Sequence, residues 1–143
     1  MQIRLHKCVS VKYQSLEDWT ESCDILRCNL LFHGKERYDC ILSQSENSAL
    51  QFSRLKALLR CKFPSGRLLD IAVVHKFTSY AKWKPNTIWA GCKVLEEEES
   101  LSFLLMDEVV RGALLAPAFG SGKKRLHNFV DTIDGDMYLR AGN

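Results

Sequence analysis

Alternating apolar and polar residues recur along this chain and predict β-strands. Residues 3–13 alternate with a period of two, which is typical of a strand with one buried face. Residues 37–43 form a second short run that is rich in β-favouring residues, and residues 87–95 form another. Residues 101–106 are strongly apolar and predict a fully buried strand or strand end, and residues 126–131 predict the last strand. The pattern therefore favours a mainly β fold.

The longest periodic segment, residues 49–63, fits two structures. Its leucines could line one face of a helix, but its residues also alternate as they would in a strand. The tight turn Pro64-Ser65-Gly66 follows this segment, and residues 68–75 beyond the turn have the pattern of a strand. We therefore favour a long antiparallel hairpin, with a helix over residues 49–63 as the alternative.

Short turns and helical segments are predicted between these strands. Ser15 precedes a Glu-Asp pair and predicts a capped helical turn that Trp19 anchors. Residues 22–32 are ambiguous between strand and loop. The four glutamates at positions 96–99 predict a solvated turn, and residues 137–140 predict one helical turn.

These elements together predict a single domain, residues 1–143, of mainly β or α+β class. We expect a curled antiparallel sheet or small β-barrel of six to seven strands with one or two short helices. The apolar content of 46% and charged content of 26% are those of a globular protein, which argues against wholesale disorder. The chain has no apolar stretch of membrane-spanning length and starts without an apolar leader. We therefore expect an intracellular protein with no membrane partner.

The six cysteines and four histidines predict neither a disulfide framework nor a zinc site. No two cysteines form a CxxC pair, and the histidines are scattered. Cys8, Cys40 and Cys61 lie in apolar runs and predict small buried side chains. We expect no bound metal and no cofactor.

Catalytic motifs are missing from the sequence. Cys92 could act as a nucleophile with His75 or His127 as its base, but no motif positions them. An acidic cluster near the end comprises Asp131, Asp134 and Asp136. It lacks the spacing and the closing glutamate of a calcium loop, and it predicts a capped, solvated turn. We therefore expect a protein that is not an enzyme.

Two segments combine basic and aromatic residues and supply the clearest binding signal. The candidate charged contacts are Lys82, Lys84, Lys123, Lys124 and Arg125. The candidate aromatic contacts are Tyr80, Trp83 and Trp89. Basic side chains neutralise phosphates and aromatic rings stack on bases. Each segment alone fits an ordinary surface loop better, and the two interpretations become comparable only if the fold brings the segments together. The net charge of +3 is compatible with a polyanionic partner but does not require one.

Three segments carry a resemblance to a known family. Residues 37–42 (RYDCIL), 109–119 (VVRGALLAPAF) and 129–140 (FVDTIDGDMYLR) resemble the C-terminal region of basidiomycete fungal proteins associated with Plavaka-type and Kyakuja–Dileera–Zisupton-type DNA transposons. The resemblance covers most of the chain, including residues 9–13. It implies a nuclear accessory domain, either at the end of a larger protein or as a freestanding copy, that lacks the transposase catalytic carboxylates. The expected architecture is also similar to bromo-adjacent-homology and Tudor-type barrels.

Two functional hypotheses follow for such a domain. The first is a non-catalytic binding module of a transposon-associated protein that contacts DNA or chromatin through the basic and aromatic loops. The alternative is a protein-interaction or self-association module without nucleic-acid binding. An exposed β edge or the apolar residues 109–119 would then supply the contact with other protein subunits. A hydrolase or metal enzyme has only scattered cysteine, histidine and aspartate residues in its favour.

Overall fold

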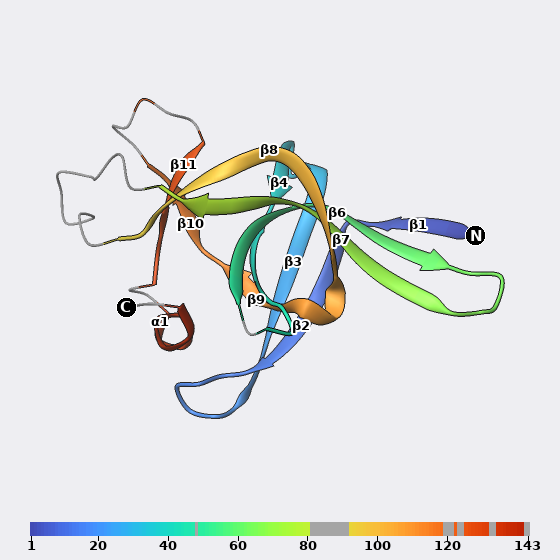
Figure 1. Ribbon diagram of the computed structural model, residues 1–143, viewed down its shortest axis with the longest axis horizontal. Coiled ribbons are helices and arrows are strands. Elements are labelled where there is room, and N and C mark those ends of the chain that lie inside the picture. Colours follow the sequence, from blue (N-terminus) through green and yellow to red (C-terminus); the bar gives the residue numbers. More distant parts are fainter. Residues whose placement is uncertain (48, 81–91, 119–121, 123–124, 132–133, 142–143) are drawn as a thin grey trace.

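The computed structural model describes the whole chain except residues 48, 81–91, 119–121, 123–124, 132–133 and 142–143. The described residues form eleven strands, a 3₁₀ turn and one short α-helix (Figure 1). The strands are β1 (Gln2–His6), β2 (Cys8–Gln14), β3 (Glu21–Phe32), β4 (Lys35–Tyr38), β5 (Cys40–Gln44), β6 (Leu50–Lys62), β7 (Leu68–Ser79), β8 (Val94–Leu105), β9 (Val109–Ala113), β10 (Leu115–Pro117) and β11 (Leu126–Phe129). The 3₁₀ turn η2 covers Met106–Glu108, and the helix α1 covers Gly135–Ala141.

The strands form one large antiparallel sheet and one small one. The large sheet has the order β10-β11-β8-β7-β6-β5-β9 and curls into a nearly closed barrel, with β1 added to the outer end of β6. The small sheet has the order β2-β3-β4. The expected mainly β, barrel-like architecture is therefore confirmed, and β1 and the small sheet lie outside its seven-stranded path.

The two faces of the large sheet bury different hydrophobic clusters. The first cluster lies between the sheet and β3, and its buried residues are Leu26, Cys28, Ile41, Leu55, Leu58, Ala72, Val74 and Val109. The second cluster involves β10, β11 and α1, and its buried residues are Cys40, Leu42, Phe77, Leu95, Leu115, Phe129, Met137 and Ala141. Cys40 and Ile41 are neighbours on β5 and belong to different clusters, because successive side chains of a strand point to opposite faces.

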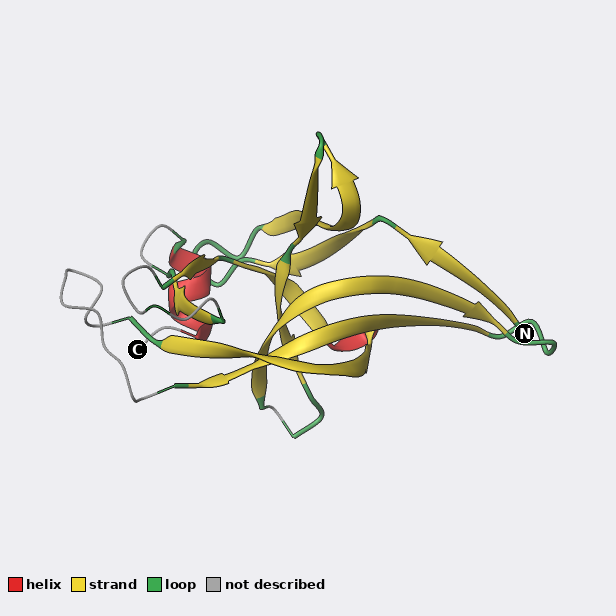
Figure 2. Ribbon diagram, turned by 90° about the horizontal axis from the view of Figure 1, so that it is seen from above, coloured by secondary structure: helices red, strands yellow, loops and turns green. Residues whose placement is uncertain are grey.

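The predicted hairpin of β6 and β7 is confirmed and supplies the longest strands of the sheet. Its registry runs from Ser53 opposite Lys76 to Lys62 opposite Leu68. The turn between the strands contains Gly66 with φ of +86°, a backbone conformation that glycine adopts without steric cost. The outer part of this hairpin, together with β1, projects from the barrel as an arm that carries the N-terminus (Figures 1 and 2).

Two predictions about β8 need correction. The four glutamates at 96–99 are not a solvated turn but part of the strand, because Glu96 and Glu97 pair with Thr78 and Phe77 on β7. The apolar residues after them form a strand, as expected, but that strand is not fully buried. Phe103 is 68% exposed, because no element of the described chain covers that face of the strand.

Three predictions near the N-terminus are also wrong. Residues 3–13 form two strands instead of one, and every residue of the first strand, β1, is exposed. Trp19 does not anchor its turn, since it is 67% exposed and has φ of 63°. Cys8 is exposed because it begins a strand at the edge of the small sheet, whereas Cys40 and Cys61 are buried as expected.

The remaining elements agree in part with the sequence pattern. The ambiguous residues 22–32 are strand β3, residues 126–129 are strand β11, and the closing helical turn is α1. Phe77 precedes the aromatic and basic segment and is buried inside β7. Most of the strand expected at residues 87–95 lies outside the described residues.

Candidate protein-interaction surface

Apolar side chains line one sheet face that runs along the projecting arm and continues onto the adjoining end of β8. In an antiparallel sheet, residues directly opposite one another share a face. Leu5 on β1 lies opposite Leu59 on β6, which lies opposite Ile71 on β7, which lies opposite Leu105 on β8. The neighbouring rows complete a set that we call the open face: Ile3, Leu5, Ala57, Leu59, Cys61, Leu69, Ile71, Val73, Leu101, Phe103 and Leu105. None of these residues is charged or forms strong hydrogen bonds through its side chain.

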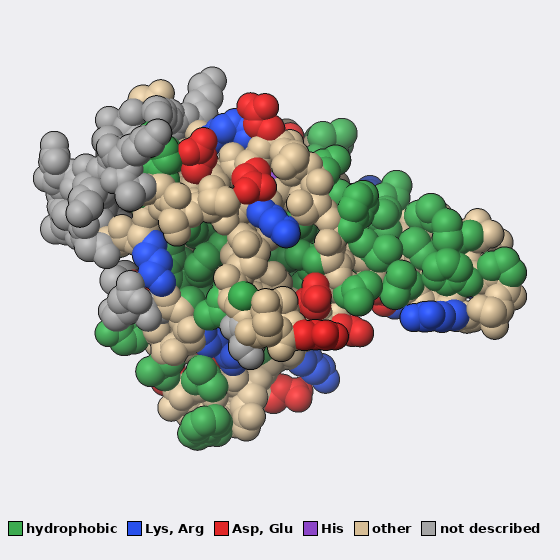
Figure 3. All heavy atoms as spheres, viewed as in Figure 1, with side chains coloured by type: hydrophobic (Ala, Val, Ile, Leu, Met, Phe, Trp, Pro, Cys, Tyr) green, Lys and Arg blue, Asp and Glu red, His purple; other side chains and the backbone are tan. Residues whose placement is uncertain are grey.

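Much of the open face is exposed to solvent. The exposed fractions are 58% for Ile3, 73% for Leu5, 58% for Leu101, 68% for Phe103 and 42% for Leu105. Because a fully exposed large apolar side chain presents about 200 Å², these five residues expose roughly 600 Å². Figure 3 shows hydrophobic side chains gathered over this end of the molecule. An apolar area of this size is at the upper end of the largest patches found on monomeric proteins, and such patches are often functional.

The opposite face of the arm is built differently. Arg60 on β6 donates two hydrogen bonds to Asp70 on β7, at 2.7 and 2.8 Å. These hydrogen bonds lower the pKa of Asp70 below its usual value and keep its carboxylate charged. Arg4 on β1 lies opposite Arg60 on the same side. The opposite face therefore carries charged residues along the arm, with Leu68 near the tip and Leu58 and Ala72 buried closer to the barrel.

At the base of the arm, a partly buried polar cluster separates the open face from the second hydrophobic cluster. Arg54 on β6 lies between Cys40 on β5 and His75 on β7 in one row across the sheet, and the row continues to Leu101. The Arg54 guanidinium forms an ion pair with Glu97 on β8. The open face is thus the uncovered continuation of the sheet face that β10, β11 and α1 cover further along.

His127 on β11 completes this cluster. Its Nδ1 lies 3.1 Å from the carbonyl oxygen of Arg125, and its Nε2 lies 3.1 Å from Nη2 of Arg54. The contacts fit the tautomer in which Nδ1 carries the proton and Nε2 accepts a hydrogen bond from Arg54. Burial lowers the pKa of His127 below its ordinary 6.5, and the Arg54 charge acts in the same direction. The ring is therefore neutral in the folded protein at neutral pH.

A second polar cluster, which the sequence analysis missed, surrounds Arg111 on β9. Its guanidinium donates hydrogen bonds to Asp136 Oδ2 at 2.7 Å and to Asp134 Oδ2 at 2.6 Å. It also lies 3.5 Å from Asp24 and 4.5 Å from the centre of the Tyr13 ring. A basic residue inside the apolar run VVRGALL was the available signal, because a buried arginine needs acidic partners.

The predicted acidic turn is therefore capped but not solvated. Asp134 Oδ1 accepts a hydrogen bond from the Met137 amide at 3.0 Å, which caps the start of α1. Asp136 is only 4% exposed. Burial alone would raise the pKa of Asp136, but hydrogen bonds from Arg140, the Leu16 amide and Arg111 outweigh it and lower the pKa. The cluster holds α1 against β9 and leaves these carboxylates engaged.

A cleft of about 380 Å³ lies beside this cluster, and its acidic side chains already have hydrogen-bond partners. Asp39 accepts hydrogen bonds from the Arg27 amide and from Arg37 Nε, and Asp24 accepts one from the Gly112 amide. Among the described residues, no group of three or more histidine, cysteine, aspartate or glutamate side chains is placed to hold a metal ion. The residues that line the cleft thus belong to the hydrogen-bond network that joins α1 and β3 to the barrel.

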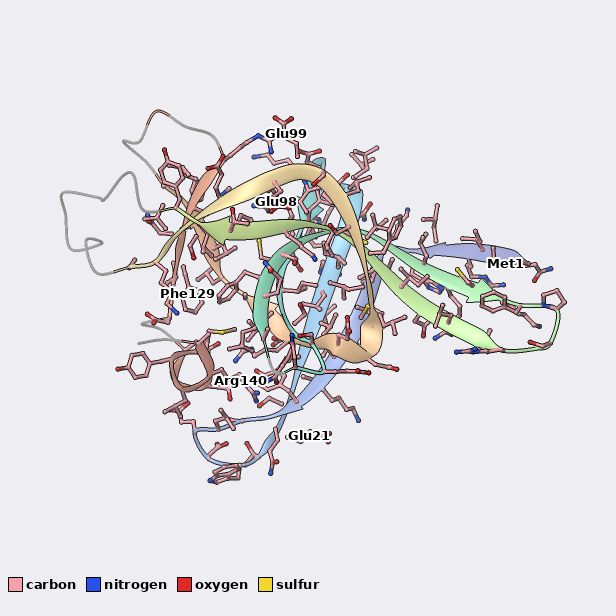
Figure 4. The ribbon with its side chains drawn as sticks, viewed as in Figure 1. Met1, Glu21, Glu98, Glu99, Phe129 and Arg140 are labelled. Atoms are coloured by element: carbon pink, nitrogen blue, oxygen red, sulfur yellow. The ribbon has the colours of Figure 1, made fainter. Side chains whose placement is uncertain are left out.

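Most of the basic and aromatic candidates lie outside the described residues. These are Lys82, Trp83, Lys84, Trp89, Lys123 and Lys124. Arg125 is described, and its guanidinium binds the Glu97 carbonyl at 3.0 Å and the Glu99 carboxylate at 3.1 Å. Glu99 and its neighbour Glu98 both lie on β8 (Figure 4). Arg125 therefore sits against an acidic strand, which reduces the positive potential there.

The other candidates have ordinary structural settings. Tyr80 is partly buried against Val94, Ala118 and Leu126 at the end of the barrel, and its amide donates to the Val94 carbonyl. Burial raises the pKa of the Cys92 thiol, which disfavours the reactive thiolate. Of residues 109–118, Val109, Leu115 and Ala118 are buried in the hydrophobic clusters, and the one exposed large apolar side chain is Leu114. This described part of the segment therefore does not form a continuous exposed apolar surface.

Comparisons with known proteins add no relative. No protein-family model, curated protein or solved structure matches the chain. The likeness to transposon-associated fungal proteins and to bromo-adjacent-homology or Tudor-type barrels stays a prediction. Within the described part of the chain, no helix has the length and apolar character needed to span a membrane.

Proposed function

We propose that this chain is a non-catalytic protein-interaction module and that the open face is its contact surface. The observation that carries this proposal is the four-stranded row Leu5–Leu59–Ile71–Leu105 with its neighbours, all apolar and exposed mainly on β1 and β8. Sheet faces of this kind are normally covered by another layer of secondary structure. The described chain provides that layer for the second hydrophobic cluster but not for the arm.

A protein partner fits the shape and chemistry of the open face. A β-sheet face packs well against a second sheet or a helix, with side chains from both layers interdigitating at about 10 Å separation. The short aliphatic side chains of the open face, with Phe103 as a larger anchor, suit such packing. Polar groups are confined to the rim and to the opposite side of the arm, as in known interfaces.

Contact with DNA or chromatin through the basic and aromatic loops is a separate proposal from the sequence. The described part of those loops offers it little support, because Arg125 is already paired with Glu99. The pair is exposed and contributes little to stability, so a phosphate could compete for Arg125. The open face supports protein interaction more strongly.

An apolar fluorescent dye tests whether the open face is available for binding. We expect 1-anilinonaphthalene-8-sulfonate to bind the dilute protein, and we expect Leu5→Glu or Phe103→Glu to remove about half or more of its fluorescence. Leu30→Glu is the matched control, because Leu30 on β3 is 73% exposed, as is Leu5, but lies outside the open face. Dye fluorescence that is unchanged by both open-face variants would overturn the proposal.

A further inference from the structure

We infer that the open face binds the open face of a second copy of this chain and forms a two-fold dimer. The inference rests on the proposed function of the open face and names its partner. In a two-fold dimer, the same patch on both copies must fit itself. The charge, the area and the edges of the open face each favour this partner.

The charge of the open face permits self-contact. A two-fold axis places a patch against its own image, so any net charge on the patch would face a like charge. All eleven residues of the open face are uncharged. The nearest ion pairs, Arg60–Asp70 on the opposite face and Arg54–Glu97 at the base, are each internally balanced. Two open faces therefore meet without electrostatic repulsion.

The area of the open face is near what a dimer requires. The roughly 600 Å² exposed by its five most accessible residues corresponds to roughly 1,200 Å² for two copies, the lower end of stable protein interfaces. The partly exposed side chains of Leu59, Leu69 and Ile71 and the rim of the arm add to this. We therefore expect a reversible dimer whose population depends on concentration.

Two copies would bury the open face by stacking their sheet faces, whereas pairing of their strand edges would leave it exposed. From residue 98 to residue 105, β8 has no strand along its outer edge in the described part of the chain. Joining two such edges would extend the sheet and leave both apolar faces in water. Pairing two β1 edges would bring Arg4 and its copy together at the centre of the strand, which is unfavourable. Stacking the two faces removes the apolar side chains from water.

Sedimentation velocity on the complete chain tests the dimer. We expect the average mass to rise from 16.4 kDa to twice that value between about 1 µM and about 300 µM protein. High salt should preserve the dimer because the contact is apolar. Leu5→Glu and Phe103→Glu should each move the midpoint to concentrations at least about tenfold higher, and Leu30→Glu should leave it unchanged.

Circular dichroism and the thermal midpoint of each variant show whether it still folds, as expected for substitutions at exposed positions.

A mass of 16.4 kDa at every concentration would overturn the dimer. If the dye still bound the open face of that monomer, the face would serve another partner and the proposed function would stand. A monomer that also binds no dye would overturn both. Assemblies that grow beyond two copies would overturn the two-fold arrangement, since they require an open-ended edge contact.

Discussion

Arg111 on β9 donates a hydrogen bond from Nη1 to Oδ2 of Asp136 on α1 at 2.7 Å, and both side chains are buried. This contact joins β9 to the helix α1. The helix contributes Met137 and Ala141 to the second hydrophobic cluster. The ion pair therefore sets the position of the layer that covers this cluster and ends before the open face.

Removing Arg111 should destabilise the fold strongly. We expect Arg111→Met to lower the free energy of unfolding by about 3 kcal/mol, because Asp134 and Asp136 lose a buried partner while Arg140 still binds Asp136. Urea unfolding followed by circular dichroism measures the change. Arg60→Met, in the exposed pair with Asp70, is the control and should have a far smaller effect. Equal losses in the two variants would contradict the structural role of Arg111.

His127 should make stability depend on pH near neutrality. The pKa of His127 is lowered in the fold from its ordinary 6.5, so the unfolded chain takes up the proton more readily. The contribution of the neutral ring is therefore present above pH 6.5 and is lost as the pH falls toward the lower pKa of the folded state. We expect His127→Gln to reduce the loss of unfolding free energy between about pH 7.5 and about pH 5.5. The same loss in the variant and the parent protein would rule this role out.

The basic loops make a prediction that is independent of the open face. If they contact nucleic acid, affinity for duplex DNA should fall on the order of tenfold or more when salt rises from about 50 to about 200 mM. Lys123→Gln together with Lys124→Gln should weaken binding about equally for all DNA sequences, and Arg125→Gln should have a smaller effect because Arg125 is paired with Glu99. A gel-shift series measures both effects. Absence of binding at low salt would reject the nucleic-acid hypothesis.

The sequence predicted where most strands lie better than it predicted which residues are buried or paired. The β6–β7 hairpin could be recognised because Pro64 and Gly66 mark the turn between two alternating segments. The strand at residues 96–99 could not be recognised from the sequence, because a run of glutamates is typical of a solvated turn. Only the structure shows that Arg54 forms an ion pair with Glu97. That partner is 43 residues distant from Glu97 in sequence.

The open face could not be predicted for a related reason. Its residues come from four segments that are far apart in sequence, and only the strand pairing places them in one layer. The alternation of Ile3 and Leu5 was visible, and it correctly indicated an apolar strand face. Alternation does not reveal whether another element covers that face, so β1 and residues 101–105 were expected to be buried.

The most direct test of the central claim is isotope-filtered NMR on an equal mixture of labelled and unlabelled protein at high concentration. This measurement detects only contacts between different copies of the chain. We expect contacts between the Phe103 ring and the methyl groups of open-face residues such as Leu5, Ile71 and Leu105, since all of them lie on the surface that the second copy covers. Contacts that arise only outside the open face, from residues such as Leu30 or Leu139, would contradict the claim.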